Sequence, residues 1–251
     1  MKSRPATNSS RSSTELLNRN PTSRIVWVTG ASSGIGKAIA DVFSTYGDTV
    51  IATSRRIPKT RSPAGRIDAL QCDVRDLSQI QRTARYILKR HRTIDILVNN
   101  AGITSFKELL KTTTREFDDI LATNLRGLFL TARAVLPSMV KNKRGIILNI
   151  LSYASKTTYT KSGAYTGSKA GAEAMMNVLR AEVRGKGIKV INVHPGAVDT
   201  AMWSQKSRTN HRASMIRPHD LARLLYVTTL QPDTIHVEEL VLRPQSGDLQ
   251  V

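Results

Sequence analysis

The sequence predicts an α/β protein with a doubly wound, mainly parallel seven-stranded sheet and helices on both of its faces. From Arg24 onward, short apolar runs alternate with longer helical patterns, and most of the short runs are apolar at nearly every position. Such alternation is typical of parallel sheets, whose strands are buried on both faces. The 251 residues contain no internal repeat and no dividing linker, which favours a single domain over residues 24–251.

The elements follow one another in a regular order. Strands are expected at residues 25–28, 49–52, 67–70, 94–98, 146–151, 188–193 and 237–242, with 67–70 the weakest. Helices are expected between them, near residues 35–46, 77–91, 115–140, 164–184 and 218–229. Residues 55–66 hold two prolines and a glycine, so an exposed basic loop is predicted there instead of a helix.

Composition and charge limit the class of protein. The chain is 40% hydrophobic, as in globular proteins, and no apolar run reaches the ~18 residues that a membrane-spanning helix needs. Cys72 is the one cysteine, which excludes an internal disulfide. The 38 basic and 19 acidic residues give a net charge of +19, which attracts phosphates, anionic substrates or nucleic acid without selecting among them.

The N-terminal segment, residues 1–23, is rich in Ser, Thr, Asn and Arg. We expect a disordered basic tail, although the composition also overlaps with that of organellar transit peptides. Because the segment lacks the apolar centre of a secretory signal, a cytoplasmic location is expected, with organellar targeting as the alternative.

A glycine-rich turn joins the first strand to the first helix. Its residues are Thr29-Gly30-Ala31-Ser32-Ser33-Gly34-Ile35-Gly36. Glycines at this place let the chain turn sharply and bring the N–H groups of a helix N-terminus close to a pyrophosphate. The turn therefore predicts a dinucleotide site of the Rossmann type around Gly30, Ser32, Ser33, Gly34, Ile35 and Gly36. A purely structural turn is the alternative, weakened by the placement directly after a strand.

Two arginines follow the end of the second strand. An acidic residue at this place would bind the adenosine ribose of NAD, whereas arginine accommodates the additional phosphate of NADP. Arg55 and Arg56 stand there and no acid does, so NADP(H) is the expected cofactor. Solvated surface charge is the alternative, since arginine is frequent throughout the chain.

Three residues form the predicted catalytic set. Ser152 follows the strand 146–151, at the strand end where open α/β sheets bind ligands. Tyr165 and Lys169 are four residues apart on a predicted helix, so their side chains share one face. A nearby ammonium lowers the pKa of a phenol and prepares it to exchange a proton with a carbonyl or alcohol oxygen. Together with the glycine turn, the set predicts an oxidoreductase that transfers hydride.

These motifs resemble those of the short-chain dehydrogenases/reductases in their compact single-domain form. The match runs from about Ile25 to the C-terminus and rests on Thr29–Gly36, Asp73-Val74, Asn99-Asn100-Ala101-Gly102, Asn124, Ser152, Tyr165–Lys169 and Pro195–Thr200. The resemblance implies that Tyr165 is the general acid/base and that Ser152 polarises the carbonyl. It implies that Lys169 bonds the nicotinamide ribose, while Asn124 positions a water of a proton relay.

The resemblance also implies the remaining contacts with the cofactor. They are Asp73 and Val74 at the adenine, Asn100, Ala101 and Gly102 beneath the cofactor, and Val198 and Thr200 at the nicotinamide carboxamide after the turn of Pro195 and Gly196. Asn99 is expected to tie neighbouring strands. The segment 199–217, which covers the substrate in this family, carries Trp203, Lys206, Arg208, His211, Arg212 and Arg217. Its cations either recognise an acidic group of the substrate or are solvated on a mobile loop.

The resulting prediction is an NADPH-dependent reductase or dehydrogenase that interconverts a carbonyl and an alcohol on a small organic substrate. The resemblance implies a homodimer or homotetramer formed through two long helices. No catalytic metal is expected, because the five histidines lack ligand spacing, and neither a membrane nor nucleic acid is expected as a partner. Two alternatives stay open. The first is a 3-oxoacyl-thioester reductase, weakened by the absence of a Gly-Gly ending; the second is a non-catalytic NADPH-binding or nucleic-acid-associated module.

Overall fold

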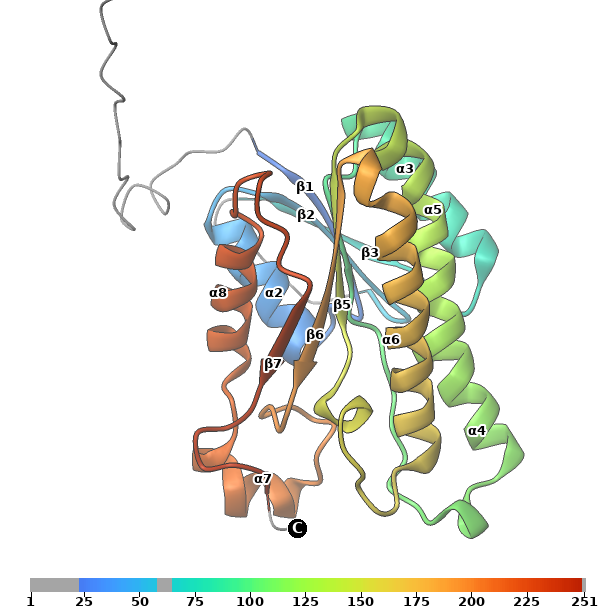
Figure 1. Ribbon diagram of the computed structural model, residues 1–251, viewed down its shortest axis with the longest axis vertical. Helices are drawn as coiled ribbons and strands as arrows, with labels where there is room; N and C mark the ends of the chain where they lie inside the picture. Colours follow the sequence, from blue (N-terminus) through green and yellow to red (C-terminus); the bar gives the residue numbers. More distant parts are fainter. Residues whose placement is uncertain (1–22, 58–64, 250–251) are drawn as a thin grey trace, which may run out of the picture.

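A computed structural model describes residues 23–57 and 65–249, and its centre is one parallel sheet (Figure 1). The strands are β1 (Ile25–Thr29), β2 (Thr49–Ser54), β3 (Ile67–Gln71), β4 (Ile96–Asn99), β5 (Gly145–Ile150), β6 (Ile188–Pro195) and β7 (Glu239–Leu242). Their order is β3-β2-β1-β4-β5-β6-β7, and each neighbouring pair is parallel. The predicted doubly wound sheet of seven strands is confirmed, and its pairing is parallel throughout.

Two layers of helices cover the sheet (Figure 1). One layer consists of α2 (Gly34–Thr45) and α8 (Pro218–Thr228), and the other of α3 (Leu77–His91), α5 (Gly127–Asn142) and α6 (Gly163–Val183). Alternate residues of a strand face opposite layers: Trp27 packs in the core under α3, α5 and α6, whereas Val28 packs in the core under α2 and α8. Because both faces are covered, the strands need apolar residues at successive positions, as their sequences have.

The predicted helix 115–140 is confirmed as one helical stretch with a π-helical turn inside it. Its parts are α4 (Thr114–Leu121), the π-helical turn η2 (Ala122–Arg126) and α5. Hydrophobic periodicity does not reveal a single wide turn, and such turns are frequent at functional sites. Here the wide turn holds Asn124, whose side chain is buried.

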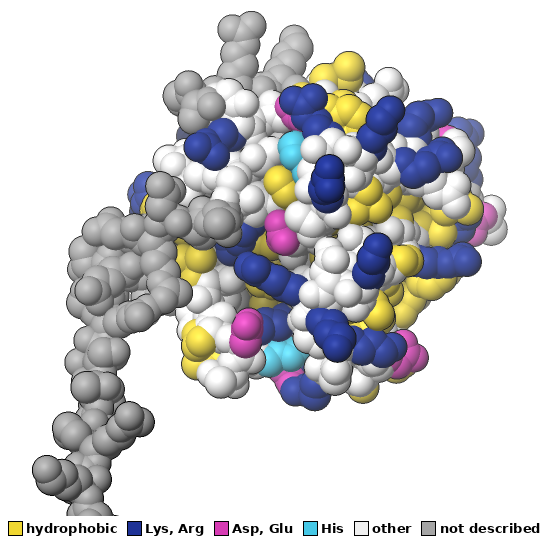
Figure 2. All heavy atoms as spheres, turned by 90° about the horizontal axis from the view of Figure 1, so that it is seen from above, with side chains coloured by type: hydrophobic (Ala, Val, Ile, Leu, Met, Phe, Trp, Pro, Cys, Tyr) yellow, Lys and Arg dark blue, Asp and Glu magenta, His cyan; other side chains and the backbone are white. Residues whose placement is uncertain are grey.

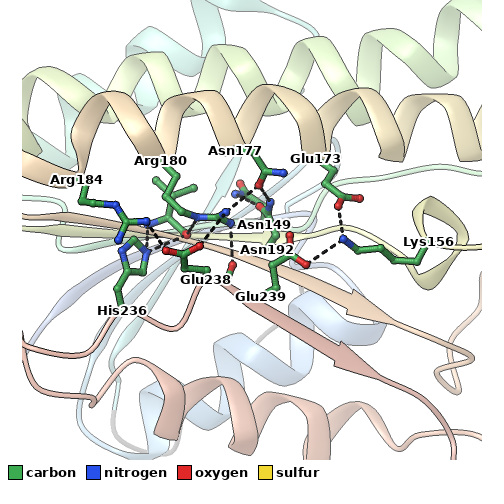
Figure 3. A network of polar contacts seen from close by, with 11 residues as sticks. Asn149, Lys156, Glu173, Asn177, Arg180, Arg184, Asn192, His236, Glu238 and Glu239 are labelled. Carbon is green, nitrogen blue, oxygen red and sulfur yellow. Dashed lines mark hydrogen bonds and ion pairs between the residues drawn. The ribbon is translucent and has the colours of Figure 1, made fainter.

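Buried asparagines link neighbouring strands just before the carboxyl edge of the sheet (Figure 3). The side chain of Asn99 donates to Asn149 Oδ1 at 3.0 Å, Asn149 donates to Asn192 Oδ1 at 3.0 Å, and Asn192 donates to Asn177 Oδ1 on α6 at 2.9 Å. The first three are register partners on β4, β5 and β6. This row of amides fixes the three strand ends and α6 in one frame, and it confirms the expectation for Asn99.

Charged side chains attach α6 to the edge strands beyond that row (Figure 3). Arg180 donates to the carbonyl oxygens of Val190 and Glu238, each at 2.8 Å. Lys156 pairs with Glu173 of α6 and, at 3.0 Å, with Glu239 of β7. The helix that carries Tyr165 and Lys169 is thus held to β6 and β7 along its length.

The face at the amino ends of the strands is strongly basic (Figure 2). Three helices of one layer end there, and basic residues stand at those ends: Lys89, Arg90 and His91 on α3, Lys141 on α5 with Lys143 as its C-cap, and Arg184 and Lys186 after α6. Cations at helix C-termini are favoured by the helix dipole, which is one physical reason for the cluster. This basic face lies at the end of the sheet opposite to the carboxyl edge.

Parts of two predicted segments lie outside the described residues, namely 1–22 of the tail and 58–64 of the basic loop. The described ends of that loop, 55–57 and 65–66, are exposed and hold no helix, as predicted. None of the helices in the described part of the chain combines the length and the apolar character that a bilayer-spanning segment requires.

Candidate active site

The glycine turn packs directly against the segment that follows β4. Gly30 and Gly34 have φ angles of +66° and +55°, which disfavour any residue with a Cβ. A Cβ on Gly36 would lie 2.5 Å from the carbonyl oxygen of Gly30, and one on Gly30 would lie 2.8 Å from Cα of Ala101. The glycines are therefore required by backbone packing.

The N-terminus of α2 fits the pyrophosphate of a dinucleotide. The side chain of Ser33, its N-cap residue, makes no capping hydrogen bond, and the first turn has no acidic residue. The N–H groups of that turn therefore keep their capacity to bind an anion. Asn100 supports the turn from below by donating to the carbonyl oxygens of Thr29 and Gly30 at 3.0 and 3.1 Å.

The end of β2, which we call the adenosine end (Ser54, Arg55 and Arg56), is open to solvent at both arginines. Gln71 donates to the carbonyl oxygen of Arg55 at 3.1 Å, and Ser54 Oγ donates to that of Arg56, so the backbone under both guanidinium groups is held in place. Two exposed guanidinium groups on an ordered backbone fit an additional phosphate on the ribose.

The adenine side of the site contains one residue that sequence reasoning missed. Burial raises the pKa of the Asp73 carboxyl, but hydrogen bonds and the charge of Arg75 outweigh burial and lower it overall. Arg75 Nη2 lies 2.8 Å from Asp73 and Nη1 lies 2.9 Å from Asp119. Arg75 thus keeps Asp73 ionised and fixed; the chain pattern gave no signal of it beyond its closeness to Asp73.

Ser152, Tyr165 and Lys169, which we call the catalytic corner, lie together as the sequence predicts. Tyr165 and Lys169 are 9% and 4% exposed, and the Ser152 side chain is near enough to the Tyr165 phenol to lower its pKa. Lys169 Nζ donates to the carbonyl oxygen of Ile150 at 2.8 Å and lies 5.8 Å from the centre of the Tyr165 ring. An ammonium has three donors, so two N–H bonds of Lys169 are left for ligand hydroxyls.

Burial controls the pKa values of the catalytic corner. It lowers the pKa of Lys169 from 10.5 to about 8. It raises the pKa of Tyr165, and the Ser152 side chain opposes this without reversing it. The expectation that the Lys169 ammonium lowers the pKa of the phenol is therefore wrong: burial raises the pKa of Tyr165, and Ser152 is the group that opposes this shift.

Asn124 lies beside the catalytic corner and is fully hydrogen-bonded. Its Oδ1 accepts from the N–H of Ile103 at 2.9 Å, and its Nδ2 donates to the carbonyl oxygen of Ile103 and to Ser168 Oγ, both at 2.9 Å. A Cβ on Gly102 would lie 3.4 Å from Asn124 Oδ1 and 3.5 Å from Lys169 Nζ. Asn124 thus fixes the backbone next to Lys169, and Ser168 is a further partner that sequence reasoning missed.

The turn after β6 brings its residues toward the same site. The N–H of Gly196 donates to the carbonyl oxygen of Leu242 at 2.7 Å, and the backbone of Val198 forms a β-bridge with Ile216. The Thr200 methyl group would lie 3.0 Å from a Cβ on Gly34, so this turn contacts the glycine turn. The two segments expected to hold the two halves of the cofactor therefore meet.

Comparison with known proteins decides the family, because residues 24–211 match the family model described as short chain dehydrogenase. The chain belongs to the short-chain dehydrogenases/reductases. Sepiapterin reductase of Chlorobaculum tepidum is 33% identical over 240 residues, which cover 90% of this chain and 98% of that protein. The 2-(R)-hydroxypropyl-CoM dehydrogenase of Xanthobacter autotrophicus is 37% identical over 191 residues, 72% of this chain and 76% of that one.

A solved structure agrees with this assignment. The crystal structure of a metagenomic short-chain oxidoreductase in complex with NADP superimposes with a TM-score of 0.78 at 32% identity, over 88% of this chain and 97% of that one. The predicted family is confirmed. As a member of it, this short-chain dehydrogenase is an oxidoreductase that acts on CH–OH groups.

Behind Ser152, this short-chain dehydrogenase holds a buried histidine that sequence reasoning set aside. His194 Nδ1 lies 3.0 Å from Ser155 Oγ and 3.4 Å from the carbonyl oxygen of Ser152, and its Nε2 is buried without a partner among the described residues. Burial lowers the pKa of His194, which favours a neutral ring that supports the backbone of Ser152. Its ligand atom lies within 4.8 Å of those of Glu173 and Glu239, but the Lys156 ammonium pairs with both carboxylates and supplies the cation there.

The cations of the segment 199–217 are not all available to a substrate. Arg208 and Arg212 each donate through Nε to Asp199, both at 2.8 Å, and hydrogen bonds from the two arginines lower the pKa of that carboxyl. The single carboxylate of Asp199 neutralises only one of these two positive charges, so both interpretations of this segment stay open.

Proposed function

We propose that this protein is an NADPH-dependent reductase that interconverts a carbonyl and an alcohol on a small organic substrate, with Tyr165 as general acid/base. One observation carries the proposal: a buried phenol has Ser152 beside it and Lys169 on the same helix face, at the sheet edge where the glycine turn lies. When bound, NADPH supplies the hydride that the carbonyl carbon receives.

Each residue of the catalytic corner has a separate task in the proposed reaction. Ser152 donates a hydrogen bond to the carbonyl oxygen of the substrate and orients it. Tyr165 passes its proton to that oxygen, so that an O–H bond forms as the C=O π bond breaks. The Lys169 ammonium stabilises the phenolate that remains, and its two free donors bind ribose hydroxyls. In the reverse direction the phenolate takes the proton from the alcohol.

The preference for NADPH over NADH rests on the adenosine end. Arg55 and Arg56 are exposed on a fixed backbone, and no acid stands at the end of β2 to compete with a phosphate. The bound NADP of the metagenomic relative supports the same choice.

Apolar side chains on the two long helices favour a dimer or tetramer. Phe129 of α5 and Val178 of α6 are 41% and 59% exposed, which disfavours a solvated helix pair. A cytoplasmic location stays a prediction from the sequence of residues 1–23.

A second candidate function is suggested by the basic face. Its cations at the ends of α3, α5 and α6 would attract a polyanion such as nucleic acid through phosphate contacts (Figure 2). This face is at the opposite end of the sheet from the catalytic corner, so a polyanion there would leave the cofactor site open. A nucleic-acid-associated module with no turnover would result if the catalytic corner were inactive.

The test is NADPH and NADH consumption by the purified protein with ketones, aldehydes, quinones and a 3-oxoacyl thioester, at two salt concentrations. The proposal predicts turnover with NADPH, weaker turnover with NADH, and preference for simple carbonyl compounds. Normal NADPH binding without turnover of any compound would contradict it. Preference for the thioester would favour the acyl-thioester reductase, and nucleic-acid binding that persists at moderate salt would favour the second candidate.

A further inference from the structure

Two aromatic rings stack between the segments that follow β4 and β6. Phe106 and Trp203 stack with ring centres 5.7 Å apart and an interplanar angle of 22°. Phe106 lies in the segment after β4 and Trp203 in the segment after β6, the two strands that flank β5. Because Ser152 follows β5, this pair, which we call the aromatic bridge, joins the two sides of the strand end that carries the catalytic serine.

Both segments leave directly from the proposed active site. Phe106 comes four residues after Gly102, which borders Lys169, and four residues reach at most ~14 Å. Trp203 comes three residues after Thr200, and its N–H donates to the carbonyl oxygen of Thr200 at 3.2 Å in a tight turn. The chain thus anchors both rings of the aromatic bridge to segments that border the proposed active site.

The surroundings of the aromatic bridge are apolar. Phe106 is 51% exposed and Met202 is 41% exposed, so apolar surface faces the solvent at this edge. Leu109 packs over Gly163 at the start of α6, so closely that a Cβ on Gly163 would lie 2.8 Å from Cγ of Leu109. Among the cations of the following helix α7 (Gln205–His211) and its end, Arg208 and Arg212 share the carboxylate of Asp199, whereas no ion pair with a described residue holds Lys206. The site thus combines a polar, buried floor with an apolar, aromatic entrance.

We propose that the aromatic bridge is the substrate-recognition element, and that the substrates are compounds whose carbonyl group is attached to a flat aromatic ring. This inference rests on the proposed reductase function. A planar ring stacks on Phe106 or Trp203 and covers ring faces that water now contacts, while its carbonyl reaches Ser152 and Tyr165. A saturated ring of the same size is puckered and stacks poorly, so it gains less from the aromatic bridge.

The kinetic test compares acetophenone with cyclohexyl methyl ketone, which differ in the planarity of the ring. Conjugation with the ring itself changes the reactivity of a carbonyl group. For each protein we therefore take the ratio of kcat/KM for acetophenone to kcat/KM for cyclohexyl methyl ketone, and compare this ratio between wild type and variants. Trp203→Leu and Phe106→Leu are expected to lower the aromatic-to-aliphatic ratio on the order of three- to tenfold. Trp203→Phe, which keeps a ring, should restore most of it. Phe117→Leu, an exposed ring on α4, is the matched control and should leave the ratio unchanged.

A second readout does not depend on turnover. The chain has two tryptophans, and Trp27 is fully buried in the core, so changes in tryptophan emission on adding a ligand report mainly on Trp203. In Tyr165→Phe, which suppresses turnover, and with NADP⁺ present, 1-phenylethanol should change the emission saturably and 1-cyclohexylethanol should change it much less. The change should disappear when Trp203→Phe is added.

The outcomes separate this inference from the function on which it rests. Turnover of both ketones with an unchanged ratio in Trp203→Leu and Phe106→Leu would overturn the role of the aromatic bridge and leave the reductase intact. Absence of turnover with a saturable, Trp203-dependent emission change would contradict the reductase while supporting aromatic binding. Equal emission changes with both alcohols would overturn the inference directly.

Discussion

The catalytic corner and the adenosine end are proposed to hold the two ends of one cofactor, yet they are built in opposite ways. Tyr165 and Lys169 are buried, and burial moves both of their pKa values. Arg55 and Arg56 are exposed, and their order comes from hydrogen bonds to their backbone. Burial shifts the pKa of groups that exchange protons. Groups that bind a phosphate in contact with water avoid the free-energy cost of burying a charge. Substitutions at the two ends should therefore differ in size and kind.

The largest expected effect is that of Tyr165→Phe. Loss of the proton donor should reduce turnover by about 10²- to 10⁴-fold, while NADPH affinity stays within about twofold. Steady-state kinetics and an NADPH titration measure the two quantities. Tyr86→Phe, on an exposed position of α3, is the control. Retention of turnover in Tyr165→Phe would refute the role given to that phenol.

The frame under the catalytic corner is tested by Asn149→Ala. The change leaves Asn99 Nδ2 and Asn192 Oδ1 buried without their partner, which should lower the free energy of unfolding by about 2–5 kcal/mol. Urea unfolding measures it, and the exposed Asn142→Ala should cost less than about 0.5 kcal/mol. Similar losses in the two variants would show that the row of amides adds no stability.

Lys169→Met separates the catalytic contribution of the buried lysine from the stability that the protein loses by burying its charge. The pKa of Lys169 is about 8 in the folded protein and near 10.5 when solvated, so the unfolded chain binds more protons between these values. Wild-type stability should therefore rise with pH through this window. At pH 7 the variant should be more stable by about 1–3 kcal/mol, with most of its turnover lost. The gain should shrink above pH 8.

The control for that series is Lys141→Met, an exposed lysine on α5. Unfolding of the cofactor-free proteins at several pH values gives the comparison. If Lys169→Met were less stable than wild type at pH 7, burial of the charged lysine would not lower the free energy of unfolding of the protein.

At the adenosine end, Arg55→Ala should have the smallest effect. We expect KM for NADPH to rise about 5- to 30-fold and KM for NADH to change less than about twofold, because a single solvated ion contact is lost. The effect should weaken with salt. Arg223→Ala, exposed on α8, is the control. Equal losses with both cofactors would place the phosphate elsewhere.

Local patterns in the sequence were sufficient for most of the fold and for the catalytic corner. Tyr165 and Lys169 are one helical turn apart, so sequence spacing alone placed them on one face of their helix. Ser152 directly follows an apolar strand, so its neighbours alone placed it at the carboxyl end of that strand. The same holds for the glycine turn. The helix predicted over 115–140 is confirmed, but its π-helical turn at Asn124 was not predicted, because that turn leaves the apolar periodicity on both sides nearly unchanged.

Contacts between distant segments were not predictable from local patterns. The stacking of Phe106 on Trp203 depends on β4 and β6 flanking β5, and the pairing of Asn149 with Asn192 depends on strand register. Likewise, charge counting did not reveal that Arg208 is bound to Asp199. The first two contacts need the strand order, which alternation of strands and helices does not specify, whereas the third joins residues nine positions apart within one loop segment.

The most direct test of the central claim follows the hydride. The protein is incubated with a carbonyl compound that it turns over and with NADPH carrying deuterium at the transferred position of the nicotinamide, and the product is examined by mass spectrometry and NMR. The account predicts one deuterium on the carbinol carbon in wild type and almost no labelled product with Tyr165→Phe. Alcohol formed without deuterium on that carbon, from either face of the labelled nicotinamide, would contradict it.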